Sequence, residues 1–297
     1  MASREGNMIR ILVDEDETYE KPGMVRKTIN RLLWFHFINT LPKGLGTTLF
    51  TRSCEHTNLI RNYSKTYKAL ELMYAYKGFA LNGNGILDSI FTHFWESSVI
   101  NAHALRNRLK LVKKELKKII IEKKNDQNIR ILSLASGSAR GVIEVLAELR
   151  DLNIEARFVD ISRDALGYSR TLAEEYRVAD KINWIRADVR NVEKFCDNWQ
   201  PDIVEAVGLF DYLNDDDAVR LIGKVYKALD QNGTLIISNV IENPEKMFVK
   251  DVVDWDMIYR DPDQLGELLI KGGFNIRSCR IILEPIGIHA VAVARRD

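Results

Sequence analysis

The spacing of hydrophobic residues changes near Asn128 and divides the chain into two regions. From about Pro22 to Lys124, apolar residues recur three and four positions apart, which is the spacing of one buried face of an α-helix. After Asn128, short runs rich in β-branched residues alternate with helical stretches. We therefore expect a helical N-terminal region over residues 1–127 and a second domain over residues 128–297.

The second region predicts an α/β fold with a mainly parallel sheet. Strands separated by helices of this length form right-handed βαβ units, in which successive strands run parallel. Five strands are expected within IRILSLAS, IEARFVDI, INWIRAD, PDIVEAVGL and GTLIISNV, in chain order. Two more, within FNIRSCRIILEP and IGIHAVAVARR, are separated by a short turn that contains Pro285 and Gly287. So short a connection predicts an antiparallel hairpin that closes the edge of the sheet.

The N-terminal region predicts three helical stretches and one loop. The helices are expected within MVRKTINRLLWFHFINTL, NYSKTYKALELMYAYKGFA and SIFTHFWESSVINAHALRNRLKLVKKELKKIIIE. LPKGLGTTLFTRSCEHT, between the first two, is expected to be a loop because of its glycines and its proline. The last helix is strongly basic from Arg106 to Lys124, and a solvated helix face is the simplest interpretation of those charges.

Composition narrows the range of partners. Lysines and arginines number 43 against 42 acids, whereas proteins that bind a nucleic-acid backbone usually carry a clear basic excess. Cys54, Cys196 and Cys279 lack the spacing of a disulfide framework or a zinc site, so no metal is expected. The N-terminus lacks a secretory pattern, and no apolar run is long enough to cross a bilayer. We expect a cytoplasmic protein that acts on a small molecule and contacts neither nucleic acid nor membrane.

Three features at strand ends point to a nucleotide-type cofactor. LASGSARG, residues 134–141, follows the first strand, and its small residues would let backbone amides approach a ligand. Asp160 ends the next strand about twenty residues later, where nucleotide-binding sheets place an acid for the ribose hydroxyls. Asp188 follows the third strand and could accept a hydrogen bond from an adenine amino group. Taken singly, an ordinary tight turn explains the loop equally well, and helix caps explain the acids.

In this order, the three features resemble the class I family of S-adenosylmethionine (SAM)-dependent methyltransferases. The resemblance implies a Rossmann-like, seven-stranded, mainly parallel sheet with an antiparallel C-terminal hairpin, and SAM as co-substrate. It places the small loop under the methionine part of SAM, the first acid at the ribose and the second at the adenine. The cofactor-binding residues that it implies are Ala135, Ser136, Gly137, Asp160, Ile161, Asp188, Val189, Val207 and Gly208.

The loop departs from the family pattern at three positions. The family usually has glycines where this chain has Ala135 and Ala139, and an acid where it has Ser133. SGSARG supplies only the last glycine of a GxGxxG dinucleotide motif, which disfavours NAD or FAD. The anchor for the amino group of SAM is therefore not identified by the sequence.

Candidate catalytic residues follow the cofactor elements. Methyl transfer is an in-line displacement that depends largely on positioning and desolvation, with help from a nearby base. Asp211 and Tyr212 follow the fourth strand, although a helix cap beside a packing aromatic explains them equally well. His289 lies in the last strand, and Tyr259 lies in a long segment, Asn243–Leu265, that could wall the substrate pocket. A satisfied core histidine and a surface helix are the simpler interpretations of these two features.

The helices before the first strand could cover the substrate pocket as a lid. They are dense in aromatic residues, most of which are expected in a core, and Arg106 and Arg108 could reach the SAM carboxylate. The aromatic residues of this region are Trp34, Phe35, Phe37, Tyr63, Tyr74, Tyr76, Phe91, Phe94 and Trp95.

The sequence favours a SAM-dependent methyltransferase that methylates an oxygen or nitrogen atom of a small molecule. A second hypothesis keeps the fold and SAM but transfers or cyclises the aminocarboxypropyl group. A third is an RNA methyltransferase that uses the basic run as a phosphate track; against it stand the near-zero net charge and the lack of an Asn/Asp-Pro-Pro-aromatic motif. A non-catalytic SAM-binding protein is a fourth.

Overall fold

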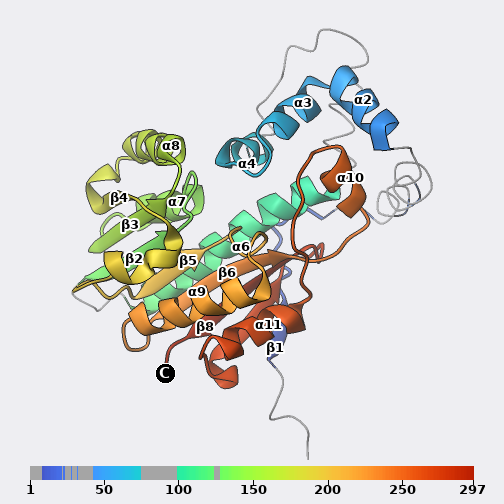
Figure 1. Cartoon of the computed structure of the whole chain (residues 1–297). Helices are drawn as coiled ribbons and strands as arrows, with labels where there is room; N and C mark the ends of the chain where they lie inside the picture. The colour runs from blue at the N-terminus through green and yellow to red at the C-terminus, as the bar shows by residue number, and fades with distance from the viewer. Residues whose placement is uncertain are drawn as a thin grey trace, which may run out of the picture. The chain divides into compact units, whose positions relative to one another are not determined.

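The strands expected after Asn128 form one mixed sheet with an added edge strand (Figure 1). The computed structural model describes residues 9–21, 23, 28, 32, 43–74, 99–123 and 128–297. The strands are β1 (Arg10–Val13), β2 (Ile129–Leu134), β3 (Ile154–Asp160), β4 (Ile182–Arg186), β5 (Ile203–Ala206), β6 (Thr234–Val240), β7 (Cys279–Leu283) and β8 (His289–Arg295). Their order is β1-β7-β8-β6-β5-β2-β3-β4, and only β8 runs antiparallel to its neighbours. The predicted α/β fold, with its antiparallel C-terminal hairpin, is confirmed.

The number of strands differs from the seven that were expected. β1 pairs in parallel with β7, from Arg10 opposite Arg280 to Val13 opposite Leu283. Ile11 is 40% exposed and Val13 is 55% exposed, so the strand covers the edge of the sheet and buries little of itself. A four-residue strand beside charged residues carries too little periodicity for the sequence to predict it.

The helices of the sheet domain begin at well-formed caps. They are α7 (Arg140–Glu148), α8 (Arg163–Glu175), α9 (Asp215–Ala228) and α11 (Pro262–Lys271), with the 3₁₀ turns η3 (Ala179–Lys181), η4 (Val189–Phe195) and η5 (Ile276–Ser278). Ser162 caps α8, Asn214 caps α9, and Asp261 forms a capping box with Gln264 at the start of α11. Each cap satisfies backbone N–H groups that a helix start leaves without partners.

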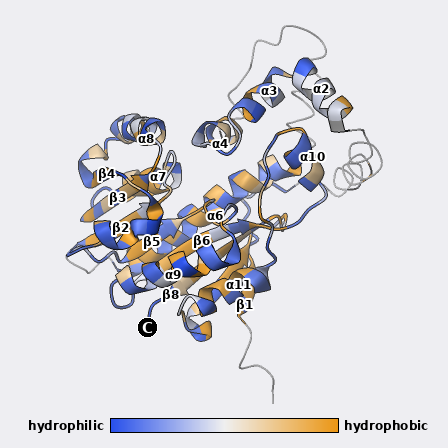
Figure 2. Ribbon diagram, in the orientation of Figure 1, coloured by the Kyte–Doolittle hydropathy of each residue, from blue (hydrophilic) through white to orange (hydrophobic). Residues whose placement is uncertain are grey.

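The core of this domain lies between the strands and one stripe of each helix. In α9, Ala218, Leu221, Ile222 and Val225 recur three and four apart and are buried. They belong to a cluster that also contains strand residues such as Leu235. Figure 2 shows hydrophobic colour along the strands and mixed colour on α9.

The chain divides into two units, at boundaries other than the break between residues 127 and 128 that the sequence predicted. Unit 1 contains Met1–Glu15, Arg108–Ile241 and Ile258–Asp297; unit 2 contains Asp16–Asn107 and Glu242–Met257. Helix α6 (Ile100–Glu122) crosses from one to the other. Helix α6 ends at Glu122, and its residues from Arg108 onward belong to unit 1, so the end of this helix is not the end of a unit.

Unit 2 is built from short helices around a small core. They are α2 (Lys43–Ser53), α3 (Glu55–Asn62), α4 (Tyr67–Tyr74) and α10 (Lys246–Asp251), together with the first turns of α6. Ile60, Met73, Leu105 and Phe248 are among its buried core residues. The predicted helix at α4 is confirmed. The predicted helix before residue 42 and most of the lid aromatics lie outside the described residues.

The predicted loop over residues 41–57 is wrong for most of its length, because α2 and the start of α3 occupy it. Glycine weakens a helix by only about 1 kcal/mol and does not forbid one. The Thr48 hydroxyl donates to Gly44 O over 2.8 Å, and Thr47 donates to Asp251 O over 3.0 Å, within unit 2. The contact of Thr47 joins α2 to a residue 204 positions away, and local propensity does not include such a contact.

The basic run of α6 is not a uniformly solvated face. Arg106 is 8% exposed and Arg108 is 3% exposed. Arg106 donates to Glu20 Oε1 over 2.8 Å and to Oε2 over 2.7 Å, within unit 2. In unit 1, Lys113 pairs with Glu144 over 2.7 Å. Among the described residues, no helix combines the length and the apolar composition that a membrane span needs.

Candidate functional site

The loop between β2 and α7 has left-handed backbone at three alternating residues. Ala135, Gly137 and Ala139 have φ angles of 51°, 54° and 51°. Ser136 N donates to Val159 O, in β3, over 3.1 Å. A left-handed alanine costs roughly 1–2 kcal/mol, and such backbone persists where the surrounding structure holds it, chiefly at functional sites. The loop thus keeps a glycine-type conformation although two of its three left-handed positions are alanines.

The carboxylate of Asp160 joins the end of β3 to this loop. Gly137 N donates to Asp160 Oδ2 over 2.8 Å, and Ser162 N donates to Oδ1 over 2.8 Å. The cap of α8 is Ser162, whose Oγ accepts from Ala165 N, so the helix-cap interpretation of Asp160 is wrong. Each carboxylate oxygen retains accepting capacity, because it holds two lone pairs and one bond. Ile161, which follows, is 67% exposed.

Asp188, in contrast, is a cap. Its Oδ1 accepts from Arg190 N over 2.9 Å at the start of η4. Hydrogen bonds from the Arg190 side chain and backbone lower the pKa of Asp188 to about 2, which keeps it ionised. Val189, the first residue of η4, is half-buried and packs against the core. The structure therefore gives Asp188 a local partner, and its contact with adenine stays a prediction.

A buried acid lies opposite the serine that stands where an acid was expected. Ser133 in β2 pairs in register with Glu205 in β5, and its Oγ donates to Glu205 Oε2 over 2.6 Å. Val207 N donates to Glu205 Oε1 over 3.0 Å. Burial raises the pKa of Glu205, against these hydrogen bonds and the charge of Arg108. The sequence analysis missed Glu205, although an acid inside the apolar run of PDIVEAV was a visible signal.

Gly208 and Arg108 meet at the end of β5. Gly208 has a φ of 85° and donates to Ser238 Oγ over 3.1 Å. A Cβ at this position would lie 3.8 Å from Arg108 Nη1 and 3.9 Å from Nη2. Nη1 also lies 3.9 Å from Asp211 Oδ2. A buried guanidinium therefore stands directly beside the loop that was expected to contact the cofactor.

Asp211 and Tyr212 are neighbours with opposite surroundings. Asp211 is 4% exposed, and its Oδ1 accepts from Val240 N over 2.9 Å. Burial raises the pKa of Asp211, although Arg108 and the Val240 amide oppose the shift. Tyr212 is 41% exposed. Since Asn214 caps α9, the expectation of a cap beside a packing aromatic does not describe this pair.

His289 and Tyr259 lie next to the same strand end. His289 is buried and pairs in register with Val240, the residue that binds Asp211. Burial, with the charge of Arg108, lowers the pKa of His289, so its ring is neutral at neutral pH. Its Nδ1 has no hydrogen-bond partner among the described residues. Tyr259 is half-buried and follows Ile258, whose N donates to Asp211 O over 2.8 Å.

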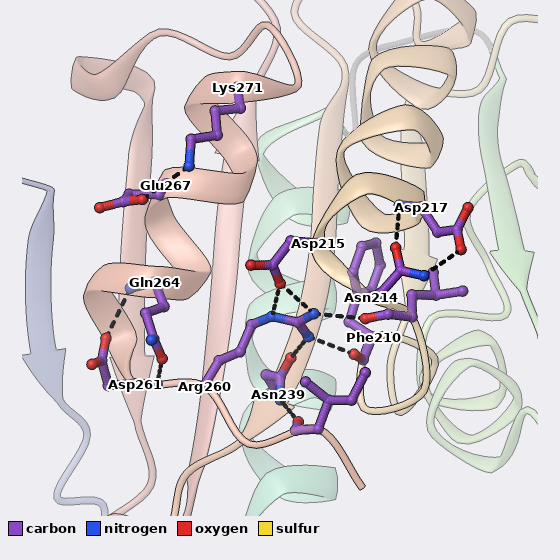
Figure 3. Close-up of polar contacts among 12 residues, drawn as sticks. Phe210, Asn214, Asp215, Asp217, Asn239, Arg260, Asp261, Gln264, Glu267 and Lys271 are labelled. Atoms are coloured by element: carbon purple, nitrogen blue, oxygen red, sulfur yellow. Dashed lines mark hydrogen bonds and ion pairs between the residues drawn. The ribbon is translucent and has the colours of Figure 1, made fainter.

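Arg260 clamps the loop after β5, as Figure 3 shows. It is 3% exposed. Its Nη1 donates to Phe210 O and to Asn239 Oδ1, each over 2.8 Å, and its Nη2 donates to Leu213 O over 2.6 Å. Nε and Nη2 also donate to Asp215 Oδ1, over 2.9 Å and 2.7 Å. Arg260 holds this loop in place, a role that no local pattern indicated.

The expected pocket wall, Asn243–Leu265, is divided between the units. Glu242–Met257 belongs to unit 2, where Trp255 is in the core. The rest belongs to unit 1 and includes Tyr259 and Arg260. Its contact with a substrate stays a prediction.

The site of unit 1 lies at the carboxyl ends of the parallel strands, where α/β sheets bind ligands. The ends of β2, β3, β4 and β5 contribute the cofactor candidates, and the ends of β5 and β6 with the start of β8 contribute the catalytic candidates. Within the described residues, no group of three or more histidines, cysteines or acids is arranged to hold a metal ion.

This arrangement is that of a Rossmann-like methyltransferase. Residues 67–296 match the family described as "Putative methyltransferase", and the chain belongs to that family. No curated protein sequence matches the chain.

Solved structures share the fold at low sequence identity. A protein from Bordetella parapertussis, described as a possible exported protein, is 14% identical with a TM-score of 0.63, covering 88% of this chain and 99% of its own. The magnesium protoporphyrin IX methyltransferase of Synechocystis PCC 6803, with S-adenosylhomocysteine (SAH) bound, is 13% identical with a TM-score of 0.55, covering 82% and 100%. The CurJ carbon methyltransferase is 14% identical with a TM-score of 0.55, covering 93% and 72%.

Proposed function

We propose that this protein transfers the methyl group of SAM to an oxygen or nitrogen atom of a small molecule. The observation that carries the proposal is the loop Ala135–Gly137, held in left-handed backbone and bonded to Asp160. Family membership supports methyl transfer, and the magnesium protoporphyrin IX methyltransferase has been solved with SAM as well as with SAH. SAM is the co-substrate.

The proposed cofactor contacts follow the strand ends. The loop after β2 lies under the methionine part, Asp160 with Ile161 holds the ribose, Asp188 with Val189 binds the adenine, and Val207 with Gly208 lies beside the sulfonium. A sulfonium methyl group is already electrophilic, so holding the nucleophile in line and excluding water supply much of the rate.

The proposed catalytic groups are Asp211, Tyr212, Tyr259 and His289. A carboxyl with a raised pKa, as in Asp211, is a stronger proton acceptor than an ordinary aspartate. The neutral ring of His289 can accept a hydrogen bond at Nδ1 and orient a hydroxyl or amine. The ring of Tyr212 can stabilise the sulfonium by cation–π attraction.

Two replacements separate the possible roles of Tyr212. If its ring contributes, Tyr212→Phe retains most of the turnover and Tyr212→Ala loses it. If its hydroxyl contributes, both variants lose turnover to a similar extent. Unchanged kcat in both, with SAH binding intact, would remove Tyr212 from the site.

Labelled SAM tests the reaction itself. Incubation with methyl-labelled SAM should move the label to a small-molecule product and leave SAH. Transfer or cyclisation of the aminocarboxypropyl group would instead move a carboxyl label, and would overturn methyl transfer. Label that appears in RNA would overturn the small-molecule assignment; the pairing of Lys113 with Glu144 within the basic run disfavours that result.

We also propose that this activity belongs to small-molecule metabolism in the cytoplasm, in keeping with a near-neutral net charge that disfavours a nucleic-acid partner. Fractionation of cells that produce the full chain tests the location. Recovery of the protein with membranes or outside the cell would contradict it.

A further inference from the structure

Glu205 is a buried carboxylate on which the charge of Arg108 acts without a direct contact that the structure records. Its side chain lies at the carboxyl end of β5, and the residue is 9% exposed. It accepts one hydrogen bond at each oxygen, from Ser133 Oγ and from Val207 N. Among the described residues, no basic side chain forms an ion pair with it. Each oxygen keeps a free lone pair, and a buried carboxylate is costly until a positive charge or further donors meet it.

The position of Glu205 matches the amino-acid end of the proposed cofactor site. Ser133 is two residues before Ala135, where the loop after β2 begins, and Glu205 is two residues before Val207. Because β2 and β5 are adjacent and parallel, both side chains lie at the same edge and on the same face of the sheet. The two loops that follow are those proposed to lie along the methionine part and the sulfonium.

We propose that Glu205 binds the ammonium group of the methionine part of SAM, so that the acid usual at position 133 is supplied by the neighbouring strand. Ser133 then orients the carboxylate instead of carrying it. This inference rests on the proposed function, since it assigns a group within the same cofactor site. An ammonium group supplies N–H donors and a positive charge in direct contact with the carboxylate, beside the more distant charge of Arg108.

The proposal predicts different effects on the affinities of two ligands that differ only in the amino-acid part. SAH carries the ammonium group, whereas 5′-methylthioadenosine has the same nucleoside and a thioether without the amino acid. Calorimetry on Glu205→Gln should show SAH affinity at least tenfold weaker and methylthioadenosine affinity unchanged. Ser133→Ala is the matched control: it removes the hydrogen bond but keeps the charge, so SAH should weaken by less than tenfold.

An exchange variant guards against loss of folding. Ser133→Asp combined with Glu205→Ser returns the acid to β2, and it should recover most of the SAH affinity that Glu205→Gln loses. Methylthioadenosine binding reports whether each variant keeps its nucleoside site. Equal losses for both ligands, or no loss for SAH, would overturn the role of Glu205. If the wild-type protein bound neither ligand, the proposed function itself would fail.

Discussion

Ala135 and Ala139 are alanines with the left-handed backbone that glycine usually adopts. Both stand where the family usually has glycine, and both adopt the φ that glycine adopts easily. The sequence predicted the place of the loop because small residues and glycine follow an apolar strand. It could not predict that the alanines would keep the turn, since bonds such as Gly137 N to Asp160 come from another strand.

Replacing Asp160 with alanine should weaken SAH binding by about tenfold or more. Hydrogen bonds to a charged group contribute about 1.5–3 kcal/mol each, and 1.4 kcal/mol corresponds to a factor of ten. Calorimetry measures the change, and Asp180→Ala, at an exposed acid in η3, is the control. Unchanged affinity in Asp160→Ala would remove this carboxylate from the site.

Replacing Ala139 with glycine should stabilise unit 1 by up to about 1.5 kcal/mol. Glycine relieves roughly 1–2 kcal/mol of left-handed strain but loses about 0.5–1 kcal/mol through the entropy of the unfolded chain. Urea unfolding monitors the midpoint. Ala147→Gly, inside helix α7, whose N-cap is Ala139, should instead destabilise by about 1 kcal/mol. A lower midpoint for Ala139→Gly would show that the loop stores no strain there.

At the scale of elements, the sequence predicted the strands and their loops better than the contacts between them. Hydrophobic runs located β2 to β8, because a strand covered on both faces is apolar throughout. β1 was not predicted because four residues carry little hydrophobic pattern. α2 was not predicted because its glycines favour a loop, although they weaken a helix without preventing it. The roles of Glu205 and Arg260 were not predicted, because their partners lie on other elements. A local pattern cannot show which distant backbone a buried charge will meet.

The backbone hydrogen bonds of Arg260 should stabilise unit 1 far more than its ion pair with Asp215 does. Arg260→Ala leaves buried carbonyls such as Phe210 O without a donor, and should cost about 2–3 kcal/mol or more. Asp215→Ala should cost less than about 1 kcal/mol, because the Asp215 side chain is 75% exposed and solvent screens the pair. Arg260→Lys should resemble alanine, since an ammonium cannot reproduce the fork of donors. Denaturant unfolding of the three variants checks this order.

At the scale of the molecule, segments of the two units alternate along the chain. Unit 2 contains Glu242–Met257, which is inserted between β6 and α11 of unit 1. Glu245 Oε1 and Oε2 accept from the backbone N–H groups of Ile100 and Asn101, over 2.7 Å and 2.9 Å. The sequence placed one boundary where the hydrophobic period changed, and an insertion of sixteen residues does not change that period visibly.

Unit 2 should lose stability in acid through Glu20. Burial disfavours its charge, but hydrogen bonds from His103 and Arg106 outweigh it and hold the pKa of Glu20 far below its usual value. A lowered folded-state pKa gives stability that is complete above the unfolded value of 4.5 and falls as the pH drops toward the folded value. Glu20→Gln should thus lower the melting temperature at about pH 7 and less so at about pH 3. Glu17→Gln, at an exposed acid, should change neither.

The lid hypothesis makes a separate prediction for unit 2. If its helices cover the substrate, hydrogen exchange in α3 and α4 should slow when SAH and substrate bind together. SAH alone should protect mainly the strand ends of unit 1. Protection confined to residues 131–213 with both ligands present would contradict the lid.

The edge strand β1 has a consequence for the order in which the protein is assembled during synthesis. Among the described strands, β1 (Arg10–Val13) pairs with β7 alone, and the ribosome makes β7 about 270 residues later. At about 5–20 residues per second, β1 waits on the order of 10–50 s for its partner. The pairing of β1 with β7 closes a very long loop. The entropy of closing this loop is lost before any contact between the two strands is gained, so the pairing is expected late in folding. On stalled nascent chains, we expect protease to cut near Val13 until Leu283 has left the exit tunnel, and to be blocked there afterwards.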